Sequence, residues 1–323
     1  MTATFGMFVK FPEPGRVKTR LAAAIGAELA AEMYSAFLSD LIPRFRDIAA
    51  RRILAYAPDD QRSREFFERL SGGSFELWAQ PEGSLGDRMR SFFEAFGPEP
   101  VVLVGSDSPT LLRGDVELAL SALHRVDCVL GPATDGGVYL IGLNRKVADK
   151  HELPVPSVSA GLVPAERHLT ATLHDDVEPL PTRLVRVDEC LKTSIHPDKP
   201  GGERASTASG DVAVRCASTG ASPVESLKRR QSVCVTKFES LFDRIEWSSL
   251  RVLEQMIDAV QEASASVELL PLCYDIDTVE DVDLLRGHLA ALEITQPELW
   301  QELVQTRRAL DVITQGRHYT PRP

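Results

Sequence analysis

Short apolar runs alternate with amphipathic stretches along most of the chain. The apolar runs predict buried strands, and apolar residues spaced three or four apart in the stretches between them predict helices. Strands and helices in this alternation predict an α/β fold, with a Rossmann-like, mostly parallel sheet and helices on both faces. The predicted strands are 4–11, 52–57, 75–79, 101–105, 128–131, 138–143 and 267–274, and the predicted helices are 19–37, 61–70, 85–96, 114–124, 250–263 and 279–292.

The stretch from about residue 147 to 237 has a different composition. No aromatic residue occurs from Leu140 to Lys237, although the chain contains 13 Phe, 5 Tyr and 3 Trp. Nearly half of residues 193–225 are Gly, Ser, Thr or Pro, and such a segment buries too little apolar surface to offset its ordering entropy. Its apolar run at 182–187 predicts a weakly paired strand. We therefore predict one catalytic domain over 1–146 and 238–292, a mostly disordered insertion over 147–237, and a helical tail over 293–323.

The net charge and the cysteine content argue against several classes of protein. The chain has 36 Lys and Arg against 47 Asp and Glu, a net charge of −11, which argues against nucleic acid as a partner. Its five cysteines are odd in number and form no C-x-x-C pair, which favours a reduced, cytoplasmic protein over a disulfide framework or a thiolate zinc site. The sequence shows no basic leader and no apolar run of about 18 residues, so we expect neither a signal peptide nor a membrane span.

The loop after the first predicted strand concentrates positive charge. It reads KFPEPGRVKTRL and carries Lys10, Arg16, Lys18 and Arg20, with two prolines that keep it extended and Gly15 that permits a turn. Four cations beside the start of a predicted helix are typical of a site for a di- or triphosphate. The loop is not a Walker motif, because that motif needs a Gly directly before the Lys, and Val17 stands before Lys18. The alternative is a solvated turn whose charge is incidental.

Two aspartates lie beside predicted strands, where open parallel sheets bind ligands. Asp107 lies two residues after the apolar run 101–105 and is the first choice as ligand of a divalent cation that in turn holds a diphosphate. Its alternative role is a helix cap or turn residue. Asp135 is the candidate catalytic base, and Gly136 and Gly137 are candidate substrate contacts because glycine lets a backbone approach a ligand closely. A plain hairpin turn explains these glycines nearly as well.

A second group of carboxylates follows the last predicted strand, in the sequence DIDTVED. Thr278 and Asp281 have the spacing of a capping box at the start of the next helix, so Asp281 is expected to be structural. Asp275 and Asp277 remain available as carboxylates at the end of a strand.

Four motifs, in this order, resemble those of a known family: KxPxPGxxKTRL, GSDSPxL, GPAxDGGxYLIGL and DIDTxED. Over about 1–145 and 238–292 the chain resembles the bacterial GT-A-type glycosyltransferase family associated with arsenosugar biosynthesis, within the nucleotide-diphospho-sugar transferase superfamily. The resemblance implies nucleotide contacts at Lys10, Gly15, Lys18 and Arg20, metal ligands at Asp107 and Asp277, and substrate contacts near Asp135. The segment GSLGDRM also fits the family, which adds Gly86 and Arg88 as nucleotide or phosphate contacts.

The chain departs from this family in two respects. The insertion interrupts it after Leu143, where the family runs nearly continuously, and a tail follows Leu292. Asp107 is flanked by Ser106 and Ser108, so the Asp-x-Asp clamp common in GT-A enzymes is incomplete.

The preferred function is transfer of a sugar from a nucleotide-diphosphate sugar to an unknown small-molecule acceptor, with Mg²⁺ or Mn²⁺ as cofactor. A nucleotidylyltransferase that uses a nucleoside triphosphate, as guanylyltransferases of this fold do, is the first alternative, because the cation-rich loop suits a triphosphate at least as well. A non-catalytic nucleotide-binding protein is the second, and the single aspartate of the metal motif is its main support.

Overall fold

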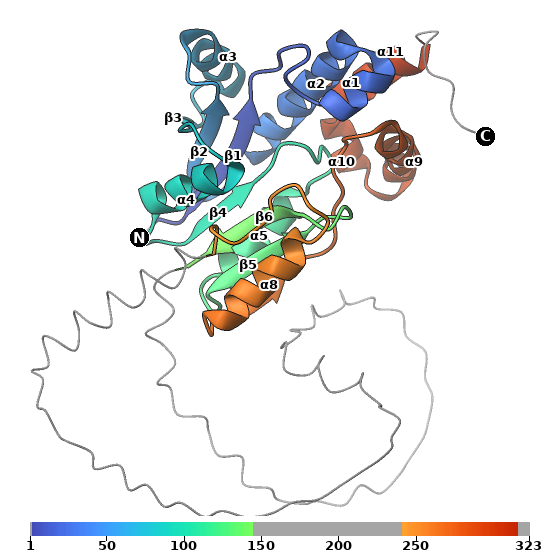
Figure 1. Cartoon of the computed structure of the whole chain (residues 1–323). Coiled ribbons are helices and arrows are strands. Elements are labelled where there is room, and N and C mark those ends of the chain that lie inside the picture. The colour runs from blue at the N-terminus through green and yellow to red at the C-terminus, as the bar shows by residue number, and fades with distance from the viewer. Residues whose placement is uncertain (1, 145–240, 316–323) are drawn as a thin grey trace, which may run out of the picture.

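A computed structural model describes residues 2–144 and 241–315 of the protein (Figure 1). The predicted insertion over 147–237, with its apolar run, lies outside the described residues. The strands are β1 (Thr4–Lys10), β2 (Arg51–Ala57), β3 (Glu76–Ala79), β4 (Val101–Val104), β5 (Cys128–Pro132), β6 (Val138–Leu143) and β7 (Val267–Leu269). The helices are α1 (Thr19–Ile25), α2 (Ala27–Phe45), α3 (Gln61–Ser71), α4 (Leu85–Phe96), α5 (Arg113–Ala122), α8 (Val252–Glu262), α9 (Val279–Thr295), α10 (Pro297–Glu302) and α11 (Val304–Gln315).

The strands form a seven-stranded sheet in the order β3-β2-β1-β4-β6-β5-β7. Strand β6 is antiparallel to both of its neighbours, β4 and β5, and the other neighbouring strands run parallel. This arrangement confirms the predicted mostly parallel α/β sheet. Because the parallel strands share one direction, the loops that leave β1, β4 and β7 all start at the same edge, which is where such sheets bind ligands.

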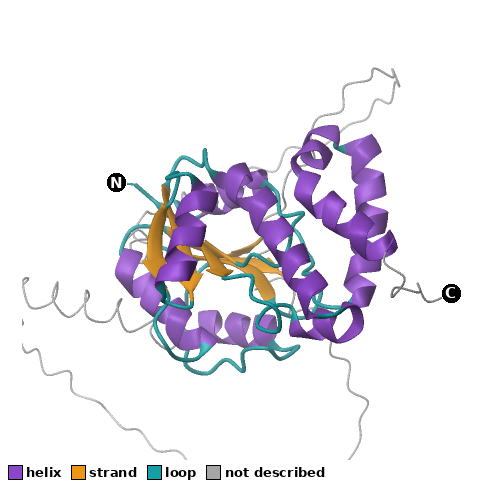
Figure 2. Cartoon of the chain, turned by 90° about the horizontal axis from the view of Figure 1, so that it is seen from above, coloured by secondary structure: helices purple, strands orange, loops and turns teal. Residues whose placement is uncertain are grey.

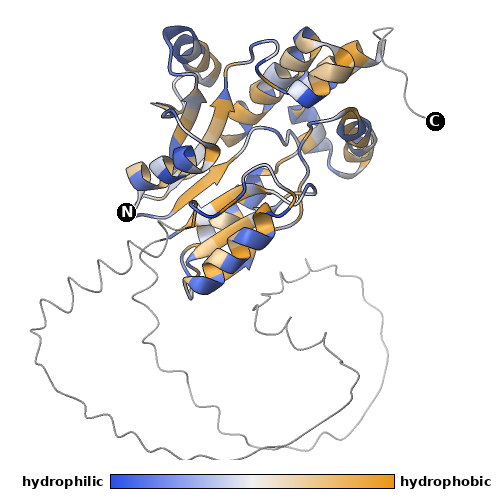
Figure 3. Cartoon of the chain, in the orientation of Figure 1, coloured by the Kyte–Doolittle hydropathy of each residue, from blue (hydrophilic) through white to orange (hydrophobic). Residues whose placement is uncertain are grey.

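Each face of the sheet has its own hydrophobic core, because successive side chains of a strand point to opposite faces. In β4, Val102 and Val104 pack into the core that includes α2, α5 and α9, whereas Val101 and Leu103 pack into the core that includes α4 and α8. Figure 2 shows helices on both sides of the strands, and Figure 3 shows that the central strands are hydrophobic over most of their length. Burial on both faces explains why these strands appear in the sequence as continuous apolar runs.

Two predicted elements differ from those observed by more than a few residues. The predicted helix 19–37 is two helices, because Gly26 between α1 and α2 has φ +94°, outside the helical region, and α2 continues to Phe45. The predicted strand 267–274 is three residues long, since Pro271 has no N–H to donate to a neighbouring strand. Pairing resumes only at an isolated bridge between Ala133 and Cys273.

The last two helices pack against the rest of the domain. Leu303, Leu310 and Ile313 are buried in the same core as α2, and Figure 1 shows α11 beside α2. The buried carboxylate of Asp40 on α2 accepts hydrogen bonds from the backbone N–H groups of Gln305 and Thr306, so it caps α11 from a different helix. Among the described residues, no helix is long and apolar enough to cross a membrane.

Candidate functional site

A pocket of about 680 Å³ opens at the carboxyl edge of the sheet. This volume lies within the usual range for small-molecule sites, roughly 300–1,000 Å³. Its lining comes from segments far apart in the sequence: the first loop with Arg16, Lys18 and Arg20, the loop after β4 with Ser106 and Asp107, helix α4 with Arg88, the turn with Asp135 and Gly137, the segment 247–249, and Asp275 with Asp277.

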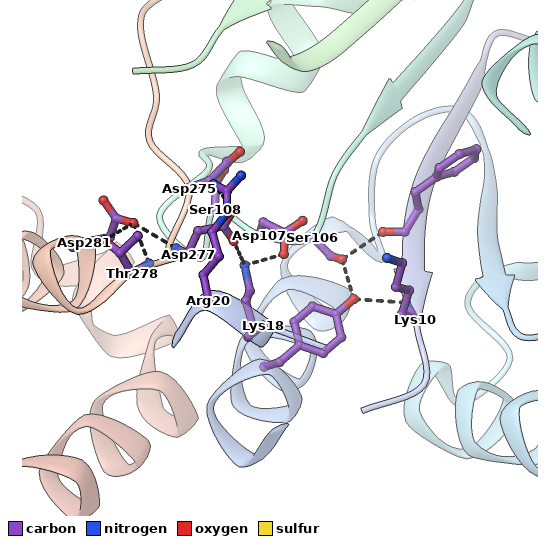
Figure 4. A network of polar contacts seen from close by, with 12 residues as sticks. Lys10, Lys18, Arg20, Ser106, Asp107, Ser108, Asp275, Asp277, Thr278 and Asp281 are labelled. Atoms are coloured by element: carbon purple, nitrogen blue, oxygen red, sulfur yellow. Dashed lines mark hydrogen bonds and ion pairs between the residues drawn. The ribbon is translucent and has the colours of Figure 1, made fainter. Parts of the chain in front are cut away.

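Lys18 joins two carboxylates that are far from it in the sequence (Figure 4). Its ammonium group contacts Oδ1 of Asp107 and lies 3.0 Å from Oδ1 of Asp277. The Lys18 side chain is only 2% exposed, whereas those of Asp107 and Asp277 are 46% and 41% exposed. Burial acts to lower the pKa of the Lys18 ammonium, but the two carboxylates raise it overall above its ordinary value. The centre of the site is therefore a buried cation between two half-exposed anions.

Hydrogen bonds fix the loop after β4 to its neighbours. The Ser106 hydroxyl donates to the Phe8 carbonyl at 2.8 Å and lies 2.8 Å from the Tyr34 hydroxyl, which also accepts from the Lys10 N–H at 3.0 Å (Figure 4). Burial raises the pKa of Tyr34 to about 12, so its hydroxyl remains protonated at neutral pH. This network orients the backbone that carries Asp107, and it uses the backbone of Lys10 rather than its exposed side chain.

Asp275 holds the same loop from the other side. Its carboxylate accepts a hydrogen bond from the Ser108 hydroxyl, and the Ile276 N–H donates to the Asp107 carbonyl at 3.0 Å. Burial raises the pKa of Asp275 to about 6, with Asp107 as a further cause. The expected capping box is confirmed, because Thr278 and Asp281 exchange hydrogen bonds at the start of α9.

Besides Lys18, the pocket is lined by Arg16, Arg20 and Arg88. Arg20 is 65% exposed, and its Nη1 lies 3.9 Å from Oδ2 of Asp277, a distance that leaves the guanidinium able to bind a ligand. Arg88 on α4 also lines the pocket and donates to the Gly83 carbonyl at 3.1 Å. Gly15 has φ +78°, which confirms the turn expected of it.

The turn with Asp135 lines the pocket but is also shaped by local structure. Oδ1 of Asp135 accepts from the Gly137 N–H at 2.9 Å. Gly136 has φ +82°, and a Cβ placed on it would lie 2.1 Å from the Leu250 carbonyl oxygen. A turn role and close packing thus account for the two glycines, while the role of Asp135 as a base stays a prediction.

The sequence did not predict one wall of the pocket. This wall is formed by Trp247, Ser248 and Ser249. Trp247 lies over Gly86, where a Cβ would be 2.4 Å from the indole Nε1, so Gly86 is needed for this packing. Ser248 adopts φ +75°, a left-handed conformation that a non-glycine residue rarely takes and that recurs at functional sites. In the sequence, the signal that could have identified this wall is a tryptophan followed by two serines.

The donor groups at the site suit a hard divalent cation with the help of a ligand. Among the described residues, no cluster of three or more His, Cys, Asp or Glu side chains could hold a metal ion by itself. However, Lys18 contacts only Oδ1 of Asp107 and Asp277, and both half-exposed carboxylates have a second oxygen. Mg²⁺ is commonly bound by one or two carboxylates together with substrate phosphates and water, and this pair meets that requirement.

Comparisons with known proteins support the fold. Residues 44–153 match the family described as "Uncharacterized protein conserved in bacteria (DUF2064)", a range that contains Asp107 and Asp135. No curated protein matches the chain.

Among solved structures, the chain is similar to a candidate nucleotide-diphospho-sugar transferase from Desulfovibrio desulfuricans, at 23% identity over 97% of this chain and 99% of that one, with a TM-score of 0.61. A cytidylyltransferase from Leptospira borgpetersenii gives 10% identity, coverage of 48% and 66%, and a TM-score of 0.33. Glucosyl-3-phosphoglycerate synthase from Mycobacterium tuberculosis, in complex with Mn²⁺ and UDP, gives 14% identity, coverage of 42% and 45%, and a TM-score of 0.29. The first score indicates that the chain shares the fold of that structure.

Proposed function

We propose that the protein transfers a sugar from a nucleotide-diphosphate sugar to a small-molecule acceptor. The observation that carries this proposal is the meeting of Asp107, Asp277 and the cationic first loop around one pocket at the carboxyl edge of the sheet. The fold shared with a candidate nucleotide-diphospho-sugar transferase supports it.

Each charged group of the pocket has its own part in binding the diphosphate. Lys18 and Arg20 donate charge-assisted hydrogen bonds to its oxygens, and Arg88 lines the same pocket and adds a further positive charge. Asp107 and Asp277 would hold a Mg²⁺ or Mn²⁺ ion, whose charge stabilises the negative charge that develops on the departing diphosphate. Binding through these groups holds the sugar next to the Asp135 turn.

The acceptor side of the proposed reaction needs a base. In the transfer step the bond from the anomeric carbon to the diphosphate oxygen breaks, and a bond from that carbon to an acceptor hydroxyl oxygen forms. We assign the proton of that hydroxyl to Asp135, with Gly136 and Gly137 as the backbone beside the substrate. Asp135 lines the pocket, which supports this assignment.

Product analysis tests the proposal. The purified protein is incubated with a panel of nucleotide-diphosphate sugars, with Mn²⁺ or Mg²⁺, and release of nucleoside diphosphate is measured by chromatography. We expect slow release without an acceptor, since water can replace the acceptor hydroxyl, and faster release when a suitable acceptor is added. Asp107→Asn should abolish the release, and absence of release from every donor would refute the proposal.

A second candidate function is nucleotidylyl transfer from a nucleoside triphosphate. The observation that favours it is the number of cations on the pocket wall, because Arg16, Lys18, Arg20 and Arg88 can neutralise a triphosphate as well as a diphosphate. The same incubation with nucleoside triphosphates and sugar phosphates distinguishes the two: nucleotidylyl transfer releases pyrophosphate, and sugar transfer releases nucleoside diphosphate. The link to arsenosugar biosynthesis and the cytoplasmic location both stay predictions.

A further inference from the structure

Lys18 occupies an unusual position for a residue expected to bind phosphate. Its ammonium is buried and bonded to two carboxylates, Asp107 and Asp277, that the metal ion of the proposed reaction would also use. The nitrogen also lies 5.9 Å from the ring centres of Tyr34 and Phe37, so the side chain is enclosed on its inner side. The ammonium therefore stays beside the carboxylates when a cation arrives.

This position has a direct electrostatic consequence for metal binding. Two carboxylates and one ammonium carry a net charge of −1, and the exposed guanidinium of Arg20, 3.9 Å from Oδ2 of Asp277, offsets part of it. The ammonium contacts Oδ1 of each carboxylate, so a divalent cation on the Oδ2 atoms is attracted by the two carboxylates but repelled by a buried positive charge only a few ångströms away. The low exposure of Lys18, 2%, limits the screening of that repulsion by water.

A bound nucleotide offsets the repulsion between the Lys18 ammonium and the divalent cation. A diphosphate brings two or more negative charges, supplies oxygens to complete the coordination of the cation, and gives the Lys18 ammonium a further hydrogen-bond acceptor. The exposed Arg20 beside Asp277 is placed to bind the same diphosphate. The metal and the nucleotide thus stabilise one another's binding. The metal alone is repelled by the Lys18 ammonium, and the diphosphate alone is repelled by the two carboxylates.

From this geometry we propose that Lys18 is an internal counter-cation that makes divalent metal binding depend on the nucleotide. The inference rests on the proposed function, in that it takes the nucleotide and metal to share this pocket. It goes further by assigning an order: the free protein binds the divalent cation weakly, and the cation enters together with the diphosphate. Lys18 acts on the metal through Asp107 and Asp277 and is therefore a positioning residue for the cation.

Direct measurement of Mn²⁺ binding tests this role without any turnover. Free Mn²⁺ is followed by electron paramagnetic resonance during titration of the wild-type chain and of Lys18→Met, with Mn²⁺ alone and then with UDP or GDP present. Removing the ammonium should tighten the binding of Mn²⁺ alone at least about tenfold, the effect of one unit charge on a dication about 5 Å away in a watery environment. Nucleotide should tighten Mn²⁺ binding more in the wild type than in the variant.

Three further variants make the result specific. Lys18→Gln is neutral but keeps a hydrogen-bond donor, so it serves if the Met variant does not fold, as judged by circular dichroism and cooperative unfolding. Lys18→Arg keeps the charge and should bind Mn²⁺ alone as weakly as the wild type. Arg62→Met removes an exposed cation outside the pocket and should leave Mn²⁺ binding unchanged, which controls for net charge.

The outcomes separate this inference from the proposed function. Tighter binding of Mn²⁺ alone in both neutral variants, but not in Lys18→Arg, supports the counter-cation role. Folded neutral variants that bind Mn²⁺ alone no more tightly than the wild type overturn it, even if nucleotide still promotes Mn²⁺ binding. A wild-type chain whose Mn²⁺ affinity does not respond to either nucleotide contradicts nucleotide-assisted entry of the metal and counts against the proposed function as well.

Discussion

Individual side chains at the pocket differ sharply in exposure, and this decides what each can do. Lys18 is enclosed and bonded to two carboxylates, whereas Arg20 is 65% exposed and 3.9 Å from its nearest carboxylate oxygen. An exposed guanidinium with a loose partner is free to bind a phosphate, while a buried ammonium mainly fixes the charges around it. The two cations of one loop therefore differ in their main role: Arg20 mainly binds the phosphate, and Lys18 mainly holds the two carboxylates and has one further N–H for the phosphate.

Replacement of Arg20 tests the phosphate-binding role of the first loop. Arg20→Ala removes a charge-assisted contact worth about 1.5–3 kcal/mol, so nucleotide affinity should fall about ten- to a hundredfold with little change in unfolding. Isothermal titration with UDP or GDP measures the change. Arg62→Ala, an exposed arginine outside the pocket, is the control. Equal affinities for Arg20→Ala and the wild type would contradict this role.

Gly136 tests how closely the segment after the insertion packs on the Asp135 turn. Alanine at a left-handed position costs roughly 1–2 kcal/mol, and a Cβ at 2.1 Å from the Leu250 carbonyl adds overpacking, for a total of about 2–5 kcal/mol. Gly73 has a similar φ of +79° with open space around it, so Gly73→Ala should lose only the first part. Denaturant unfolding of both variants gives the comparison, and equal losses would show that the close approach does not matter.

Residue roles divide into those that local sequence could predict and those that it could not. The capping role of Asp281 follows from its spacing to Thr278 and is observed. The contact of Trp247 with Gly86 joins residues on either side of the insertion, and no local pattern encodes it. The same holds for the ion pairs of Lys18, since its partners depend on which strands become neighbours.

Among the helices, α2 connects the C-terminal helices to the site. Arg44 on α2 is buried and donates to the carbonyls of Pro109 and Leu111, just after the loop that carries Asp107, and its Nε donates to Glu302 on α10 at 2.8 Å. One guanidinium thus ties α10 and the loop after β4 to the same helix. The segment after residue 292, expected from the sequence to be a helical tail, takes part in this support.

The two partners of this ion pair should differ in their effect on stability. Arg44→Met leaves two carbonyl acceptors without their donor and should cost about 2–4 kcal/mol. Glu302→Gln loses less than about 1 kcal/mol, because Glu302 is 51% exposed and its charge is screened. Denaturant unfolding measures both losses, and hydrogen exchange of residues 105–112 should speed up only in Arg44→Met. Similar behaviour of the two variants would show that Arg44 does not support the loop.

Element boundaries followed the sequence wherever hydrophobic periodicity was the deciding factor. The strand at 138–143 and the helix at 85–96 have the predicted bounds, since an apolar run and a capping serine define them. The break at Gly26 was not predicted, because the apolar spacing continues through it from Leu21 to Ala30. A glycine inside an amphipathic pattern is tolerated in many helices, so backbone geometry rather than pattern decides the break.

For the whole molecule, the alternation of strands and helices was enough to predict the fold class and the edge at which the pocket lies. The shape of the pocket could not be predicted from this alternation. One of its walls, at 247–249, comes from the part of the chain that follows residues 147–237. The interpretation of 147–237 as a disordered insertion rests on composition and stays a prediction.

Deletion of the insertion tests whether the described segments form a complete domain. Joining Arg145 to Phe238 through a short Gly-Ser linker should give a chain that still unfolds cooperatively and still binds nucleotide, because the cores on both faces of the sheet are built from residues of the described segments. Thermal unfolding with and without UDP or GDP measures both properties. Loss of cooperative unfolding would show that 147–237 contributes to the core.

The proposed nucleotide and metal site pairs a cationic loop with two carboxylates, and one titration decides whether the pair acts in this way. Nucleotide binding to the wild type, Asp107→Asn and Asp277→Asn is measured with and without Mn²⁺. Asparagine keeps the shape of each side chain but removes the charge that makes its oxygen a strong metal ligand. We predict that Mn²⁺ strengthens nucleotide binding in the wild type and that both variants fold yet lose this effect. A Mn²⁺ effect of unchanged size in both variants would contradict it.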